Sequence, residues 1–213
     1  VAVNVKKPLI ETRFLPFTFA HIKEGYYTSA MSIFSGGSAY KWACNQLCRD
    51  IVNEADALHI VDMWAEKVPI GSNGVLFNPS LAGGTTQDKS PYIQGAFLGL
   101  SLAATREDMV RSVLEEGIAM NLRLLLNEME THIGAADDIL MCGGGSRSTI
   151  WRRIFADVFN TTIVRTNVDQ STAVLGAAAI AARGCGLWTD YHPIAQIHHT
   201  QNLECPTPEN AIK

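Results

Sequence analysis

The feature that most constrains the fold is a short apolar run that ends in three consecutive glycines. Residues 139–142 read Ile-Leu-Met-Cys, and residues 143–146 read Gly-Gly-Gly-Ser. An apolar run of this length, broken by glycine, predicts a buried β-strand. Apolar residues then recur at helical spacing over residues 150–158. A strand, a glycine turn and a helix in this order indicate an α/β fold.

The glycine turn has the chemistry of a phosphate or ribose site. Glycines let a backbone approach a ligand closely, and the first amides of the next helix offer free donors and a positive dipole end. A mononucleotide site is one interpretation, and a tight turn without a ligand is the other. The pattern GxxxxGK[ST] fails because its lysine is missing, and GxGxxG fails because its third glycine is replaced by Ser148.

Several elements are predicted ahead of this turn. Valines alternate over residues 1–5, as in a half-buried strand. Apolar spacing predicts helices over residues 36–51 and 58–68, the second stopped by the following proline. Residues 71–74 form a turn into a short apolar run at residues 75–77.

Further helices and a strand complete the predicted order. Thr105 and an aspartate three residues later form a capping box, and helical spacing continues until Gly134. Residues 163–164 predict a strand, and residues 172–184 predict a buried, Ala-rich helix whose last glycine forms a left-handed cap. Strands that alternate with helices favour an α/β layer sandwich with a mainly parallel sheet, and no linker divides it.

Composition excludes several classes of protein. The chain has 213 residues, 47% hydrophobic and 18% charged, as expected for a globular domain. A net charge of -4 without an arginine-rich run argues against a nucleic-acid partner. The uncharged apolar stretch at residues 173–182 is far shorter than the ~20 residues of a membrane span, and no signal peptide is recognisable at the amino end.

The cysteines indicate a reducing compartment, and we expect a cytoplasmic protein. Five cysteines form an odd, sparse set, unlike the even framework of a small secreted domain. Cys44 and Cys48 are four residues apart, but no Cys or His follows at zinc-finger spacing. They are therefore predicted to be buried thiols, and no histidine is assigned a role.

Several stretches between Gly71 and Gly186 match a known family through their order and spacing: residues 95–100, 111–119, 143–148, Trp151, 156–157 and 175–178. The first two resemble the strand-to-helix passage of the FGGY carbohydrate kinases, and the others resemble the adenosine motif and closing helix of that family. From Gly71 to Gly186 the sequence thus resembles the carboxy-terminal half of these kinases, in particular the xylulokinase-like members. The chain departs from the family at residues 83–87, where a Gly-Glu-Arg-Thr-Pro type of stretch is frequent, and at Arg153, where glutamine is frequent.

The resemblance implies an actin/hexokinase-like (ribonuclease H-like) lobe, with a mainly parallel or mixed sheet flanked by helices. Residues 1–213 would be the carboxy-terminal nucleotide-binding domain of a two-lobe sugar kinase whose amino-terminal lobe is absent from the chain. The implied reaction transfers the γ-phosphoryl of Mg-ATP to a sugar, with D-xylulose giving D-xylulose 5-phosphate. ATP, Mg2+ and the sugar are the implied ligands, and a homodimer is the implied assembly.

Other functions stay open beside this one. A kinase of the same family could act on glycerol, ribulose or gluconate, and a non-catalytic protein could keep the fold alone. A dinucleotide-binding oxidoreductase is a further alternative, since Asp169 near the end of the next strand could bind a ribose.

The same likeness assigns the site residues. Residues 35–42 resemble the family helix beside the nucleotide, so Gly37 and Lys41 would border the ATP site. A lysine on an amphipathic helix is often a solvated surface residue, which leaves the role of Lys41 open. Gly144 and Ser148 would contact the adenosine part. The loop around them would be shaped by Gly143, Gly145 and Ser146. In the family the aspartate base belongs to the first lobe, and the β-phosphate loop would lie just ahead of Val1. The resemblance therefore implies no catalytic residue, no metal ligand and no activity for this chain alone.

Overall fold

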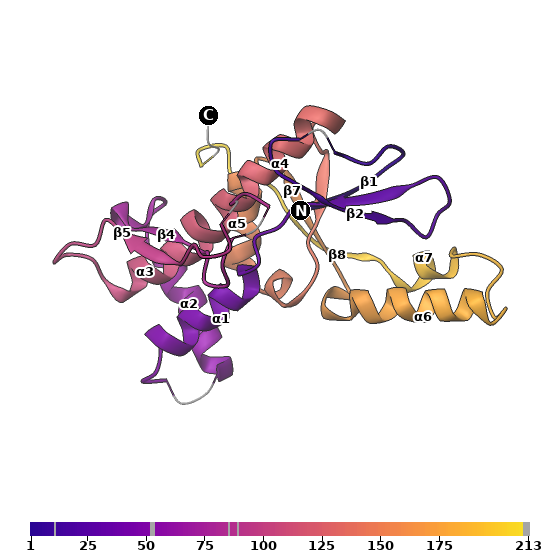
Figure 1. Cartoon of the computed structure of the whole chain (residues 1–213). Helices are drawn as coiled ribbons and strands as arrows, with labels where there is room; N and C mark the ends of the chain where they lie inside the picture. Colours follow the sequence, from indigo (N-terminus) through magenta and orange to yellow (C-terminus); the bar gives the residue numbers. More distant parts are fainter. Residues whose placement is uncertain (11, 52–53, 85, 89, 211–213) are drawn as a thin grey trace. The chain divides into compact units, whose positions relative to one another are not determined.

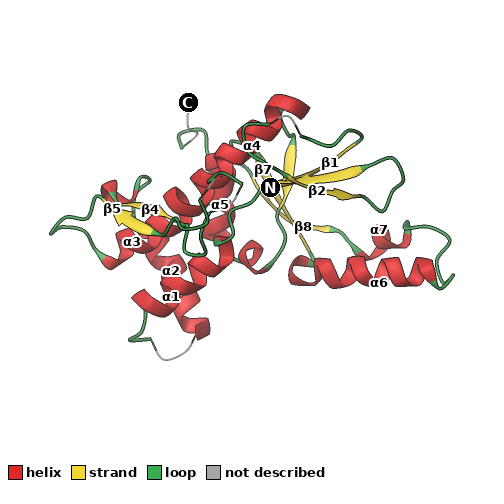
Figure 2. Cartoon of the chain, in the orientation of Figure 1, coloured by secondary structure: helices red, strands yellow, loops and turns green. Residues whose placement is uncertain are grey.

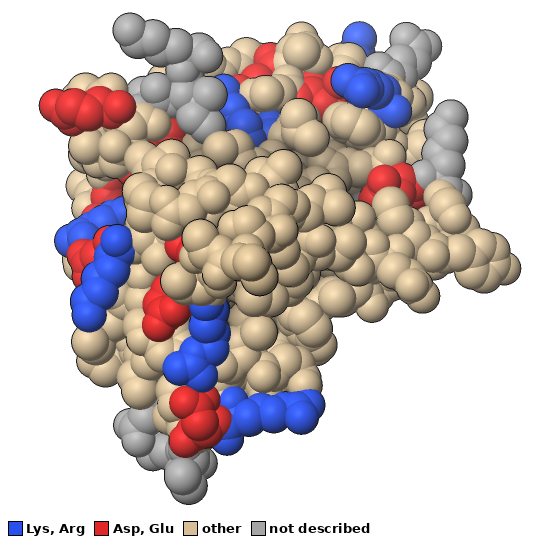
Figure 3. Space-filling view, turned by 90° about the vertical axis from the view of Figure 1, so that its left-hand side faces the viewer, with Lys and Arg blue, Asp and Glu red and all other residues tan. Residues whose placement is uncertain are grey.

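A computed structural model describes residues 1–10, 12–51, 54–84, 86–88 and 90–210. The chain divides into two compact units, Val1–Ala135 and Ala136–Lys213 (Figure 1). We describe each unit by itself. None of the helices in the described ranges is both long and apolar enough to cross a membrane. On the face shown in Figure 3, basic and acidic side chains lie beside one another and form no single basic patch.

The first unit begins with a three-stranded antiparallel sheet. Strands β1 (Ala2–Val5), β2 (Phe17–Ala20) and β3 (Tyr27–Ala30) pair in the order β1-β3-β2. Val3 and Val5 lie in β1, Val1 directly precedes it, and all three are half-buried, which confirms the first predicted strand. A buried cluster follows the sheet and joins it to a later helix through three residues with at most 1% exposure: Met31, Leu125 and Met129.

Two helices and a small hairpin sheet follow in the same unit (Figure 2). Helices α1 (Gly36–Leu47) and α2 (Glu54–Lys67) confirm the two predicted helices. The first is shorter than predicted because Cys48 leaves helical geometry, so Ile51 lies beyond its end. The short helix η1 (Ser72–Gly74) leads to β4, and β4 (Leu76–Asn78) pairs antiparallel with β5 (Ala96–Leu98).

The long predicted helix is present and contains an irregular centre. It consists of α3 (Arg106–Ser112), a π-helical segment η2 (Val113–Ala119) and α4 (Met120–Ile133). The capping box is confirmed, since the Asp108 amide donates to Thr105 Oγ1 at 3.2 Å and the Thr105 amide donates to Asp108 Oδ2 at 2.8 Å. Gly134 ends the helix with φ 82°, and every residue of η2 is buried.

The second unit is built on a mixed sheet. Strands β6 (Asp138–Leu140), β7 (Thr162–Thr166) and β8 (Thr200–Glu204) lie in this order, with β6 and β7 parallel and β7 and β8 antiparallel. The mixed alternative is therefore correct, because among the described strands β6 and β7 form the one parallel pair. The short helices η3 (Gly144–Arg147) and η4 (Asp169–Ser171) and the helices α5 (Thr149–Phe159), α6 (Thr172–Gly184) and α7 (Pro193–Ile197) complete the unit.

Three predictions for this unit are wrong in detail. Strand β6 is not buried, since Leu140 is 46% exposed at the edge of the sheet. In α6, Ala179 is the one buried residue, because apolar side chains of the helix such as Val174 (71% exposed) and Ile180 (55% exposed) are not covered by other elements. The left-handed glycine after α6 is Gly186 and not Gly184, which is still helical. The sequence predicted no element after Gly184, yet residues 200–204 form β8, since the partner strand β7 supplies their hydrogen bonds.

Candidate nucleotide-binding site

The glycine loop connects β6 to α5 and contains η3. The backbone of Gly143 has φ +91°, a left-handed conformation that favours glycine. The amide of Gly143 donates to the carbonyl of Asp169 at 3.1 Å, which ties the loop to η4. The amide of Met141 donates to Val164 at 2.9 Å and continues the parallel ladder up to the loop. The start of the loop is thus fixed by backbone hydrogen bonds.

The three glycines meet different steric demands. Gly143 carries the left-handed angle, and a Cβ on Gly145 would overlap the indole ring of Trp151, which is 4% exposed. Gly144 is exposed and lies outside the left-handed region. A Cβ there would meet only Nε2 of Gln170, at 3.3 Å, and that group ends a flexible exposed side chain. The fold therefore explains the glycines at 143 and 145 and places little demand on 144.

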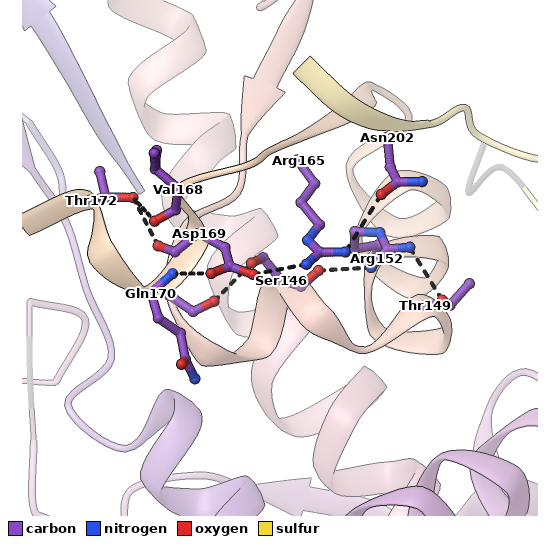
Figure 4. Close-up of polar contacts among 10 residues, drawn as sticks. Ser146, Thr149, Arg152, Arg165, Val168, Asp169, Gln170, Thr172 and Asn202 are labelled. Atoms are coloured by element: carbon purple, nitrogen blue, oxygen red, sulfur yellow. Dashed lines mark hydrogen bonds and ion pairs between the residues drawn. The ribbon is translucent and has the colours of Figure 1, made fainter. Parts of the chain in front are cut away.

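A buried network holds the far side of the loop (Figure 4). Ser146 is fully buried, and its Oγ donates to the Gly143 carbonyl at 2.8 Å. Arg152 is 3% exposed and donates from Nη1 to the Ser146 carbonyl at 2.7 Å. The same guanidinium donates to Glu204 Oε1 from Nε at 3.2 Å and from Nη2 at 2.9 Å. No sequence pattern singled out Arg152, because a charged residue on an amphipathic helix is usually solvated.

Ser148 forms the N-cap of α5. Its Oγ accepts a hydrogen bond from the amide of Trp151 at 3.1 Å, in the geometry that satisfies one of the first amides of a helix. The hydroxyl proton is still able to donate to a ligand. A contact to the adenosine part remains a prediction for Ser148, since a local capping role also accounts for the serine.

Gly37 and Lys41 lie in the first unit, on α1. They are four residues apart and therefore share one side of the helix. A Cβ on Gly37 would have no atom within 4 Å, and Lys41 is exposed. The structure thus groups the predicted residues of the glycine loop in one unit and the two helix residues in the other.

A small cavity lies beside the start of α1. Its volume of about 10 Å³ has room for roughly one water molecule, too little for a sugar or a nucleotide. The residues around it are Ile33, Phe34, Ser35, Pro79, Ser80, Gly83, Gln87 and Asp88. It therefore does not supply a ligand site within the first unit.

Asp169, the candidate ribose-binding acid, has other partners. Its Oδ2 accepts from Nη2 of Arg165 at 2.8 Å, and its Oδ1 accepts from the amide of Gln170. The hydrogen bond from Arg165 is the main reason why the pKa of Asp169 lies below its ordinary value. The carboxylate therefore stabilises η4, and its geometry does not favour the dinucleotide alternative.

The thiols and histidines form no metal centre within the described ranges. Cys44 and Cys48 are buried, as predicted, whereas Cys142, Cys185 and Cys205 are exposed. No group of three or more His, Cys, Asp and Glu side chains that could hold a metal ion occurs among the residues described.

A glycine loop between a strand and a capped helix, on a mixed sheet with helices, defines a protein of the α/β class. The chain belongs to the FGGY family of carbohydrate kinases, since the model of the family's C-terminal domain matches residues 1–185. This confirms the resemblance stated from the sequence. The dinucleotide-binding oxidoreductase has no further support.

Individual relatives and solved structures agree with this assignment. The gluconokinase of Bacillus licheniformis is 26% identical over 97% of this chain and 41% of its own length. The xylulose kinase of Staphylococcus xylosus is 36% identical over 54% of this chain and 23% of its own length. The structure of the xylulose kinase from Rhodospirillum rubrum superposes with a TM-score of 0.80 and 26% identity, covering 99% of this chain and 41% of that one. The fold class is therefore actin/hexokinase-like, and the chain spans less than half the length of these relatives.

Proposed function

We propose that this chain is the nucleotide-binding lobe of a two-lobe, ATP-dependent carbohydrate kinase. The lobe binds the adenosine part of ATP at the loop of residues 143–148, with Gly37 and Lys41 at the border of the site. It contributes nucleotide binding and lobe closure to a reaction that transfers the γ-phosphoryl group to a sugar hydroxyl.

The observation that carries this proposal is the exposed glycine at position 144. Gly143 and Gly145 have steric reasons within the fold, whereas Gly144 has an ordinary backbone angle and a flexible neighbour. A residue without a side chain at an exposed position leaves the backbone open to a ligand. The amides at the start of η3 have no carbonyl partner one turn earlier, as at any helix start, and can donate to ribose or phosphate oxygens.

The residues fit ATP better than they fit its metal ion. Glycine backbone, the Ser148 hydroxyl and a lysine are suited to ribose and phosphate oxygens. Mg2+ prefers several oxygen ligands, and the described residues contain no cluster of acidic side chains that would supply them. We therefore assign no Mg2+ ligand to this chain and place the aspartate base in the other lobe. When bound, the ion would neutralise charge on the phosphates.

The proposed acceptor is D-xylulose, which would give D-xylulose 5-phosphate. Support comes from the xylulose kinases among the relatives and from the structure of the Rhodospirillum rubrum enzyme. Gluconate is the second candidate, because the gluconokinase of Bacillus licheniformis aligns over 97% of the chain. Glycerol and ribulose stay open, since we place most sugar contacts in the other lobe. We further propose a cytoplasmic homodimer.

A panel of acceptors tests the function. The full-length protein that contains this chain is incubated with Mg-ATP and D-xylulose, gluconate, ribulose or glycerol, and ADP release is followed. Turnover with D-xylulose and a mass increase of the sugar by one phosphoryl group support the proposal. Turnover with gluconate alone assigns the second candidate. Tight binding of NAD without binding of ADP contradicts a kinase of any specificity.

A further inference from the structure

The side chain of Gln170 lies beside the exposed part of the glycine loop. Its Nε2 is 3.3 Å from the place that a Cβ of Gly144 would occupy. Gln170 is itself exposed and extends away from Asp169 and Arg165 in the close-up (Figure 4). A carboxamide therefore borders the one glycine of the loop at residues 143–145 whose missing side chain the fold does not require.

Hydrogen bonds fix the backbone that carries this carboxamide. The carbonyl of Asp169 accepts from the Gly143 amide at 3.1 Å and from Thr172 Oγ1 at 2.8 Å. The carboxylate of Asp169 accepts from the amide of Gln170 and, at 2.8 Å, from Arg165. These contacts hold η4 against the glycine loop. The backbone of Gln170 is therefore held beside the loop, and its exposed side chain reaches Gly144 from this fixed point.

The carboxamide itself makes no hydrogen bond to any side chain or backbone group in the described parts of the chain. A glutamine amide offers one acceptor and a donor side by side, which matches the N6 amino group and N7 of adenine. Guanine presents two acceptors, O6 and N7, at the same edge, and is matched by arginine. The free amide beside the loop thus has the chemistry to distinguish the two purines.

We propose that Gln170 is a specificity-determining residue that favours an adenine over a guanine nucleotide. The inference rests on the proposed function, because it places the nucleobase next to Gly144. It adds a residue of η4 to the proposed site at the loop. The hydrogen bonds of Gln170 would select the base, while the backbone of the loop would bind groups that all nucleotides share.

Calorimetric titration with ADP and with GDP tests this role in the full-length protein. In the Gln170→Ala variant we expect the preference for ADP to fall at least about fivefold, which is roughly 1 kcal/mol. Gln170→Arg presents two donors and should shift the preference toward GDP, a change that a merely structural residue would not cause. Gln201→Ala is the matched control, because it removes an exposed glutamine from β8 in the same unit.

Each outcome decides one of the two proposals. A lower ADP preference in Gln170→Ala, with Gln201→Ala unchanged and both variants melting near the parent temperature, supports the role of Gln170. An unchanged preference in both Gln170 variants overturns it and leaves nucleotide binding intact. A parent protein without any preference for ADP also overturns it. A parent protein that binds neither nucleotide overturns the proposed function, and the role of Gln170 with it.

Discussion

Ser72 Oγ donates to Oε2 of Glu116 at 2.8 Å and joins a left-handed turn to the π-helical centre of the long helix. Both residues are buried, and Ser72 and Asn73 have φ of 47° and 52°. Asn73 donates to Oδ1 of Asp108 at 2.8 Å, so two carboxylates of one long helical segment hold the turn. Sparsely populated angles of this kind persist only where surrounding contacts over-determine them.

The buried carboxyl group of Glu116, which accepts from Ser72, predicts that the stability of the fold depends on pH. Burial is the main reason why the pKa of Glu116 rises to about 7, and the charge of Glu115 adds to this, while Ser72 and Arg111 oppose it. The folded state therefore keeps a proton that the unfolded state releases above its ordinary pKa of 4.5. Stability should fall as the pH rises from about 4.5 to about 7, by at most ~1.4 kcal/mol per pH unit.

Urea unfolding between pH 5 and pH 8 measures this slope. Glu116→Gln should remove most of it and raise stability above pH 7, because the amide carries no charge and its oxygen still accepts from Ser72. Glu24→Gln is the control, since it removes an exposed carboxylate from the same unit. A slope that is the same in Glu116→Gln and in the parent protein would show that Glu116 does not titrate in this range.

We expect substitution of Arg152 to lower the stability of the fold strongly. Arg152→Met leaves the Ser146 carbonyl and the Glu204 carboxylate without their donor, and loss of one partner of a buried ion pair costs about 3 kcal/mol. Chemical denaturation measures the difference. Arg183→Met, on the exposed surface of α6 in the same unit, should change stability by less than about 0.5 kcal/mol. Equal effects of the two substitutions would contradict the structural role of Arg152.

Local chemistry explains which parts of the fold the sequence predicted. The capping box at Thr105 and Asp108 depends on groups three residues apart, and the glycine turn depends on glycines that lie together. Both signals are contained in a few consecutive residues. The strand, turn and helix around the candidate site were therefore predictable before any long-range contact was known.

Long-range contacts decide the parts that were missed. Strand β8 is mostly exposed and polar, and it forms because β7 offers free backbone groups. The π-helical segment η2 is buried on all sides, so no apolar periodicity distinguishes it from an α-helix. Arg152 is stabilised by Glu204, a residue far along the chain. No local pattern reports these partners.

The 213-residue chain alone is predicted to phosphorylate no sugar. We assign the aspartate base to the other lobe and the β-phosphate loop to a segment outside these 213 residues, and a nucleotide-binding lobe without them cannot activate the acceptor hydroxyl. The chain is incubated with Mg-ATP and each acceptor, and mass spectrometry searches for the phosphosugar. The full-length protein under the same conditions is the positive control. Phosphosugar formed by the chain alone would overturn this assignment of roles.

Gly144→Val is the substitution that separates a ligand site from a simple turn. The fold should tolerate it, since the backbone angle is ordinary and the one neighbouring group ends the flexible side chain of Gln170. The branched side chain would nevertheless occupy the space that a nucleotide must approach. ADP affinity should therefore fall at least about tenfold, which is ~1.4 kcal/mol, while the melting temperature without ligand changes little.

Two matched variants complete the test of position 144. Gly145→Ala should lower the melting temperature, because its Cβ overlaps the buried ring of Trp151 and overpacking costs about 1–3 kcal/mol. Gly184→Val should leave ADP binding unchanged, since that glycine lies at the end of α6 with no atom within 4 Å of its Cβ position. Titration of ADP into the full-length variants, paired with thermal unfolding, distinguishes the three effects. If folded Gly144→Val binds ADP as the parent protein does, the loop only turns the chain and the nucleotide must bind elsewhere.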